Sequence, residues 1–174
     1  MFFFLSLGSN IDGELSAIRM LGQLVSRFRR VGAYPFFYTE PEDIVSDCAF
    51  VNGLVIIYAE GSEACVKNQL NDIEISMGRD RRDPKRSVRS RAADIDILGA
   101  SAFFDLGVIA RASEPYVQQC FNMAGARVPL EKYGLTAYQR ASTIDFDAGS
   151  GQIRVVEDEF QGFINWVEAT FGLQ

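Results

Sequence analysis

Residues Ile73–Leu98 read IEISMGRDRRDPKRSVRSRAADIDIL, and this stretch organises the rest of the chain. It ends in an Asp-x-Asp pair, Asp94 and Asp96, set among apolar residues. Because a β-strand directs alternate side chains to one face, we expect both carboxylates to point the same way while Ile95 and Ile97 pack inward. Mg²⁺ in proteins is commonly held by one or two carboxylates together with substrate phosphates. The stretch therefore predicts a strand that carries a magnesium site.

A dense basic segment precedes this predicted strand. Guanidinium groups match phosphate oxygens bidentately, and two metal ions about 4 Å apart can hold a phosphorus centre during in-line displacement. The acidic pair and the basic segment together indicate a polyphosphate site, and we expect the segment to be a loop that orders over the polyphosphate. Its basic residues are Arg79, Arg81, Arg82, Lys85, Arg86, Arg89 and Arg91.

Each of these features alone also has an ordinary explanation. A charged run between two elements is usually a solvated loop, and an Asp-x-Asp pair is often a surface pair. In combination they favour a site, because carboxylates set among isoleucines are costly to desolvate without cations. We expect the adjacent loop or a bound metal to supply those cations.

The composition limits the class of protein. The chain has 174 residues, of which 48% are apolar, so we expect a single domain over residues 1–174 with a real core. A net charge of -6 argues against a general nucleic-acid binder, because such domains normally carry a basic face. The cysteines show no CxxC spacing, which favours a reducing cytoplasm over a disulfide framework or a zinc site. The opening apolar run is too short for a membrane span, so we expect no membrane association.

Two absences from the sequence narrow the chemistry. Histidine does not occur, which removes the commonest general base and leaves oxygen-ligand metal chemistry and electrostatic catalysis as the practical options. No GxxxxGK[ST] motif occurs either, which disfavours a P-loop kinase. Side chains must therefore hold any phosphate.

Hydrophobic periodicity predicts strands with interspersed helices. Besides the Asp-x-Asp strand, the predicted strands cover residues 2–7, 31–38, 50–58 and 153–156. The predicted helices cover residues 15–28, 62–77 and 160–171, and a short hairpin is expected over 101–109. Pro35 indicates an edge position or a bulge in the second strand. This order favours an α+β fold with a ferredoxin-like antiparallel sheet and helices packed on it, over a doubly wound sheet.

Two polar residues lie inside apolar segments. Asn52 interrupts the strand FVNGLVIIY, and it either satisfies nearby backbone at a bulge or binds the polar edge of a flat heterocycle. Glu74 lies near the edge of the apolar face of its helix. It is either a surface charge or a contact close to the metal and phosphate pocket.

Four segments of the chain, taken in order, resemble the 6-hydroxymethyl-7,8-dihydropterin pyrophosphokinases of folate biosynthesis. They are LGSN at 7–10, FYTEP at 37–41, FVN at 50–52, and the block that runs from Glu74 through Gly78-Arg79 to RAADIDIL at 91–98. The family pattern in that block reads like E-x-x-x-G-R-x-R, followed by G-P-R-x-x-D-x-D-I-L.

The resemblance implies a transferase, a ferredoxin-like pyrophosphokinase that moves the terminal diphosphate of ATP to a pterin hydroxymethyl group and releases AMP. Its partners would be ATP and the pterin, with no nucleic acid or membrane, and it would act as a monomer. On matching positions, Asp94 and Asp96 would bind two Mg²⁺ ions, and the catalytic set would be Arg79, Arg91, Asp94 and Asp96. The nucleotide would be held by Glu74, Arg81, Arg91, the backbone of Ile97, Arg111, Ser113 and Tyr116. The pterin pocket would be lined by Thr39, Pro41, Phe50, Asn52 and Phe121.

The chain also departs from the family pattern. Arg89-Ser90 stand where Gly-Pro is usual, Tyr116 stands where the family has histidine, and Glu40 replaces a usual proline. Two other hypotheses therefore stay open. One is a catalytically weak or silent relative that binds metal and a phosphate ligand for regulation. The other is an unrelated ferredoxin-like module that binds single-stranded nucleic acid, which the acidic body and the lack of an RNP-like motif disfavour.

Overall fold

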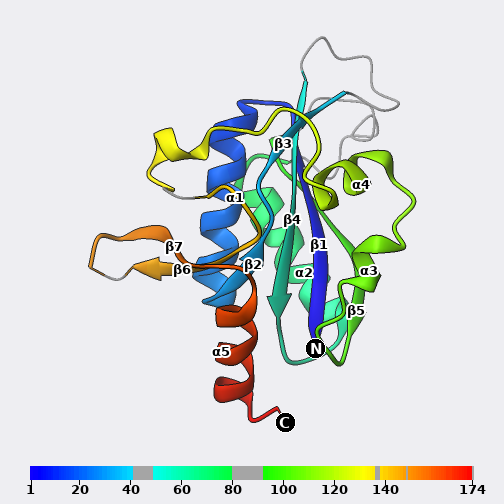
Figure 1. Ribbon diagram of the computed structural model, residues 1–174, viewed down its shortest axis with the longest axis vertical. Helices are drawn as coiled ribbons and strands as arrows, with labels where there is room; N and C mark the ends of the chain where they lie inside the picture. Colours follow the sequence, from blue (N-terminus) through cyan, green and yellow to red (C-terminus); the bar gives the residue numbers. More distant parts are fainter. Residues whose placement is uncertain (41–48, 80–91, 136–137, 148, 174) are drawn as a thin grey trace.

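The computed structural model describes residues 1–40, 49–79, 92–135, 138–147 and 149–173 (Figure 1). The strands are β1 (Phe2–Ser9), β2 (Val31–Ala33), β3 (Phe37–Thr39), β4 (Phe50–Tyr58), β5 (Asp94–Ser101), β6 (Ser142–Asp147) and β7 (Gln152–Asp158). The helices are α1 (Gly13–Phe28), α2 (Glu63–Ser76), α3 (Gly107–Ala110), α4 (Pro115–Phe121) and α5 (Gln161–Phe171), with a 3-10 turn η1 (Leu130–Tyr133).

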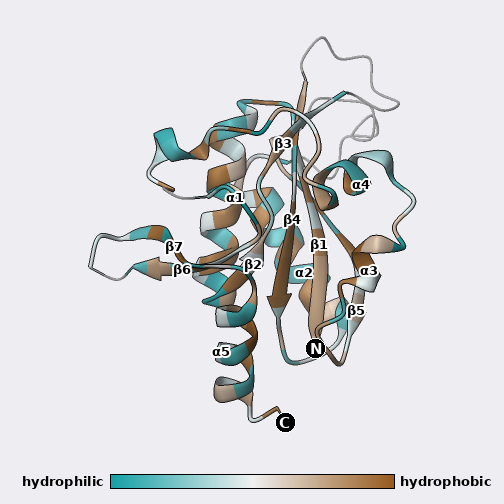
Figure 2. Cartoon of the chain, viewed as in Figure 1, coloured by the Kyte–Doolittle hydropathy of each residue, from teal (hydrophilic) through white to brown (hydrophobic). Residues whose placement is uncertain are grey.

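The strands form one antiparallel sheet in the order β5-β1-β4-β2-β6-β7, and β3 pairs with β4 beside β2. The chain order β1-α1-β2-β4-α2-β5 is the ferredoxin-like arrangement of two βαβ halves. The predicted α+β fold, an antiparallel sheet with helices packed on it, is therefore confirmed. Strands β1 and β4 lie at its centre, and Figure 2 shows that both are strongly apolar.

Each face of the sheet carries its own apolar core. Phe3 and Leu5 of β1 belong to the core beneath α1 and α2, whereas Phe2 and Phe4 belong to the core beneath α3, α4 and α5. This alternation follows from the period of two in a strand. It continues along β1, so Ser6 lies on the face that α4 covers.

The segment around Pro35 forms two short strands instead of one. Strand β2 lies inside the sheet between β4 and β6, so the edge position is wrong for β2. The alternative, a bulge, agrees with the register, because three residues, 34–36, stand opposite two residues of β4, 53 and 54. Pro35 itself lies between β2 and β3, where it interrupts neither ladder.

The hairpin expected over residues 101–109 is wrong, because this segment contains the short helix α3. Helix α3 begins at Gly107 after the N-cap residue Leu106. Before it, the Asp105 carboxylate accepts the N–H of Gly107 at 2.9 Å, and the Asp105 carbonyl accepts the N–H of Val108 at 3.1 Å. An aspartate that binds the backbone N–H two residues on forms an Asx-turn, which here leads into the helix.

Candidate functional site

Asp94 and Asp96 lie at the start of β5, the strand at one end of the described sheet. Ile95 between them is fully buried, while Asp94 is half-buried and Asp96 is exposed. The strand and its alternation are as predicted. The two carboxylates consequently lie on one face, the face that α4 covers.

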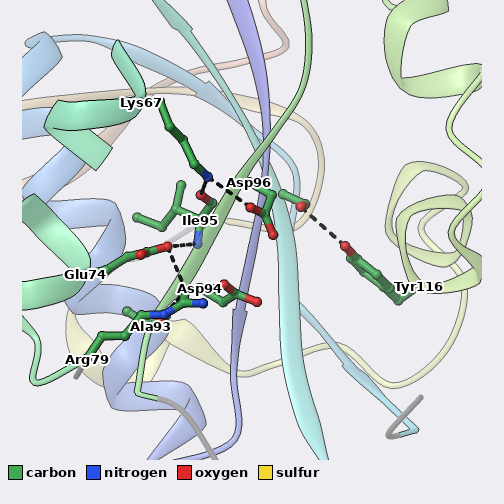
Figure 3. Close-up of polar contacts among 9 residues, drawn as sticks. Lys67, Glu74, Arg79, Ala93, Asp94, Ile95, Asp96 and Tyr116 are labelled. Atoms are coloured by element: carbon green, nitrogen blue, oxygen red, sulfur yellow. Dashed lines mark hydrogen bonds and ion pairs between the residues drawn. The ribbon is translucent and has the colours of Figure 1, made fainter. Parts of the chain in front are cut away.

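Two side chains of α2 hold the backbone of the residue between the aspartates (Figure 3). Glu74 Oε1 accepts the N–H of Ile95 at 2.7 Å, and Lys67 Nζ donates to the carbonyl oxygen of Ile95 at 2.8 Å. Edge strands leave backbone groups without a strand partner, and here a helix supplies side-chain partners instead. Glu74 and Lys67 are two helical turns apart, so they project from the same side of α2.

Each aspartate has a cationic partner from outside its strand. Arg79 forms ion pairs with Asp94 and, at 2.9 Å, with Glu74, while Lys67 Nζ lies 3.0 Å from Asp96 Oδ1. Burial by itself lowers the pKa of Arg79, but the surrounding carboxylates outweigh burial and raise that pKa above its usual value. Lys67 was not among the predicted site residues. The prediction that the adjacent loop or a metal supplies the cations is therefore incomplete, because Lys67 of α2 supplies one of them.

Glu74 is buried at the base of this cluster. Its side chain is only 1% exposed, so the interpretation as a surface charge is wrong. A buried carboxylate needs partners, and here the partners are the Arg79 guanidinium and the Ile95 N–H. Glu74 therefore orients two parts of the site, namely the first arginine of the basic segment and the backbone of β5.

The register of the sheet links the acidic pair to Asn52. Gly8 of β1 pairs with Asp94 on one side and with Asn52 on the other. Neighbouring strands lie about 4.8 Å apart, so the Cα atoms of Asp94 and Asn52 are about 10 Å apart across Gly8. A Cβ atom on Gly8 would lie 2.6 Å from Oδ1 of Asn52. Glycine at this position of the LGSN segment is thus required by the close approach of the amide.

Asn52 does not lie at a bulge, because the β1–β4 register is continuous through it. Its side chain is nearly buried, and Nδ2 donates to Thr39 Oγ1 at 2.6 Å. Cys120 of α4 packs behind it, with Sγ 3.5 Å from the Asn52 carbonyl oxygen. Burial raises the pKa of the Cys120 thiol to about 12, so this sulfur stays protonated at neutral pH.

Tyr116 of α4 points toward the strand that lies next to the acidic pair (Figure 3). Its hydroxyl is 3.4 Å from Ser6 Oγ, and Ser6 pairs with Asp96 in the β1–β5 register. Burial raises the pKa of Tyr116. The hydrogen bond with Ser6 lowers this pKa. The charges of Asp96, Glu114 and Asp94 raise this pKa further. Tyr116 is therefore connected to the strand of the acidic pair through Ser6 of β1.

The remaining predicted site residues that the structure describes are spread over several elements. Arg111 is exposed and pairs with Asp105 at 3.3 Å, and Ser113 is exposed in the turn between α3 and α4. Phe50 pairs with Thr39 at the start of β4, two residues before Asn52. Phe121 contacts the ring of Tyr34, with the ring centroids 5.8 Å apart.

Other predictions cannot be placed. Pro41, Arg81 and Arg91 lie outside the described residues, as does the basic segment over 80–91 that we expected to order over a polyphosphate. Ile97 is described, and its side chain packs on the core beneath α1 and α2, which leaves its backbone as the part proposed for the nucleotide.

Two features are absent from the described residues. None of the helices there is long and apolar enough to span a membrane. In the same part of the chain, no group of three or more cysteine, aspartate or glutamate residues is arranged to hold a metal ion.

The fold and the site together define a ferredoxin-like α+β domain with an acidic pair and flanking cations at one end of its sheet. Residues 4–138 match the family described as 7,8-dihydro-6-hydroxymethylpterin-pyrophosphokinase (HPPK), so the chain belongs to this family of pyrophosphokinases. The match runs from β1 past η1 and ends before β6. No curated protein matched the chain.

Proposed function

We propose that the chain transfers the terminal diphosphate of ATP to the hydroxymethyl group of 6-hydroxymethyl-7,8-dihydropterin and releases AMP. One observation carries this proposal: Asp94 of β5 and Asn52 of β4 lie on the two sides of Gly8 of β1, on the face of the sheet that α4 covers. The separation of about 10 Å suits metal-bound phosphates at one side and a flat heterocycle at the other. Phosphoryl transfer needs mainly positioning and charge stabilisation, so a chain without histidine can perform it.

Two Mg²⁺ ions fit the donor set at Asp94 and Asp96. The protein offers two carboxylates there, and Mg²⁺ usually completes its six ligands with phosphate oxygens and water. Both carboxylates already attract cations, since Arg79 and Lys67 lie against them. When bound, the ions would neutralise charge on the transferring diphosphate and align it with the attacking hydroxyl.

Arginine side chains would hold the phosphates. Arg79 already lies between Asp94 and Glu74, and we propose that it exchanges part of this pairing for a phosphate oxygen, with Arg91 as the second arginine. Because Glu74 is buried, we propose that it acts on the nucleotide through Arg79 and Ile95 and not by touching it. The further nucleotide contacts would come from Arg81, the Ile97 backbone, Arg111, Ser113 and Tyr116.

Asn52 would recognise the pterin. Its Nδ2 donates to Thr39, so we assign Oδ1 as the acceptor for an N–H group of the pterin ring. The other proposed pocket residues are Thr39, Pro41, Phe50 and Phe121.

We propose further that residues 1–174 act as a single domain, as a monomer, in the cytoplasm. Sedimentation of the full chain at about tenfold different concentrations tests the oligomeric state, because only an associating chain changes its apparent mass.

Calorimetric titration and an assay for AMP together test the function. A non-hydrolysable ATP analogue should bind only with Mg²⁺, the pterin should bind after it, and AMP should appear with the natural substrates. The alternative is the silent relative, which the replacement of the family's histidine by Tyr116 favours. That protein would bind Mg²⁺ and the analogue but release no AMP. A chain that binds neither ligand would contradict both proposals.

A further inference from the structure

Strand β3 carries Thr39, the partner of Asn52, and it is only three residues long. On one side it pairs with β4, with Phe37 opposite Asn52 and Thr39 opposite Phe50. On the other side it meets the segment after α4, where the Tyr38 N–H donates to the carbonyl of Ala126 at 2.9 Å. Such a short strand has few ladder hydrogen bonds of its own, so side-chain contacts contribute much of its order.

All three polar groups of Tyr38 have partners from different parts of the chain. Besides the N–H to Ala126, the carbonyl accepts from Gln119 Nε2 of α4 at 3.0 Å, and the hydroxyl donates to Glu14 Oε1 of α1. Tyr38 therefore fixes β3 to helices on both faces of the sheet.

The acceptor for the Tyr38 hydroxyl is itself held in place. Glu14 lies in the first turn of α1, where the helix dipole favours a negative charge. It also accepts from the Tyr133 hydroxyl at 3.2 Å and forms an ion pair with Lys132, both on η1. A carboxylate with these partners stays ionised, and hydrogen bonds to ionised groups are stronger than bonds between neutral groups.

The alternation of β3 separates this anchor from the pocket. The Tyr38 side chain packs on the core beneath α1 and α2, whereas Phe37 belongs to the opposite core. Thr39 is on the same face as Phe37, because residues two apart in a strand share a face. The anchor thus lies on one face of the sheet, and the Thr39–Asn52 contact lies on the other.

We propose that Tyr38 and Gln119 are positioning residues for the pterin pocket, which hold β3 so that Thr39 Oγ1 stays in place for the Asn52 amide. This inference rests on the proposed function, but it assigns roles to residues that touch neither substrate. The Asn52 amide then presents Oδ1 to the ligand in a fixed orientation. A pocket organised before binding loses less entropy when the pterin enters.

The full chain with Tyr38→Phe tests the proposal, and Tyr133→Phe is the matched control. Each variant removes one hydroxyl group that donates a hydrogen bond to the Glu14 carboxylate, but only Tyr38 belongs to β3. We expect Tyr38→Phe to speed hydrogen exchange at the amides of residues 38 and 39 in the ligand-free protein. It should weaken pterin binding in calorimetry about tenfold, the effect of one lost charge-assisted hydrogen bond, while the affinity for the ATP analogue changes less than about twofold.

Tyr133→Phe should leave the exchange rates and both affinities near those of the wild type. Gln119→Met removes the second anchor from the α4 side, and it should reproduce the selective loss of pterin affinity. The proposal is overturned if Tyr133→Phe has the same effect as Tyr38→Phe, or if nucleotide and pterin affinities fall together. Unchanged exchange at residues 38 and 39 in Tyr38→Phe also overturns it.

A failure of the proposed function gives a different result. If the wild-type protein binds no pterin, the proposed function is contradicted. The inference would then concern only the position of β3. The exchange rates of the two tyrosine variants would still decide whether Tyr38 holds β3.

Discussion

Glu74 of α2 accepts the backbone N–H of Ile95 at 2.7 Å, so a helix side chain fixes the residue that separates the two aspartates of the site. The same carboxylate pairs with Arg79, which in turn pairs with Asp94. A single buried group thereby contacts both the backbone between the two aspartates and the arginine that pairs with Asp94. The acidic pair is oriented by α2 as well as by its own strand.

Replacement of Glu74 should cost stability. Glu74→Ala leaves the Ile95 N–H and part of the Arg79 charge without partners in a buried place, and we expect the free energy of unfolding to fall by about 2 to 3 kcal/mol. Glu74→Gln keeps an oxygen acceptor for Ile95 and should lose less. Urea denaturation followed by circular dichroism measures both. A loss below about 0.5 kcal/mol for Glu74→Ala would show that the cluster contributes little.

The two aspartates should differ in their effect on folding. Asp94→Asn weakens the pairing of the half-buried Arg79, so we expect a lower melting temperature. Asp96 is 58% exposed and pairs only with the flexible Lys67 in the described part of the chain, so Asp96→Asn should change stability by less than about 0.5 kcal/mol. Thermal unfolding of both variants at the same pH provides the comparison. Equal shifts would mean that the pairing with Arg79 has no net effect.

Both variants should lose catalysis if the aspartates hold the metal. Each substitution removes one ligand charge, and metal ions contribute several kcal/mol to transition-state charge stabilisation, so we expect AMP release to fall at least about a hundredfold. Calorimetry with Mg²⁺ and the ATP analogue should show weaker metal binding in parallel. Near wild-type turnover in either variant would exclude that residue as a metal ligand.

Lys67 should oppose metal binding. Its ammonium lies 3.0 Å from Asp96, so a cation that binds there must displace or tolerate it. Lys67→Met keeps the aliphatic stem and removes the charge, and we expect the affinity for Mn²⁺ or Mg²⁺ to rise about threefold, as for an exposed ion pair. Lys132→Met, which removes a cation remote from the aspartates, is the control and should leave that affinity unchanged. A lower affinity in Lys67→Met would mean that the hydrogen bond to Ile95 matters more than the charge.

Acidification should weaken the anchor of β3. The hydrogen bonds from Lys132 and then Tyr38 lower the pKa of Glu14 below its usual value of 4.5. A carboxyl group whose pKa is lower in the folded state stabilises the fold above its unfolded pKa, and this stabilisation is lost as the pH falls through the folded pKa. Between about pH 6 and about pH 3, the wild type should therefore lose more stability than Glu14→Gln. Melting temperatures across this range test the difference, and parallel curves would contradict it.

Local patterns in the sequence predicted the central part of the fold. The continuous apolar run of β1, the helical spacing in α1 and the alternation in β5 each reflect burial of one face or both, which is a local property. Strand β6 was not predicted, because its sequence STIDFD is short and partly polar and its place beside β2 depends on distant residues. The helix α3 lies where the pattern predicts a short hairpin, because four residues are too few to show a helical period.

The sequence by itself determined the chemistry of the site: two carboxylates on one strand face, a basic segment before them, and an asparagine inside a central strand. Only the tertiary structure decided which partners these groups have. Lys67 is 29 positions from Asp96, and Glu74 is 21 positions from Ile95, yet the packing of α2 against the end strand brings each pair into contact. The link from Tyr38 to Glu14 arises in the same way, through the approach of β3 to the start of α1. Such contacts depend on how packed elements meet and not on any local period, so the spacing of residues along the chain carries no signal for them.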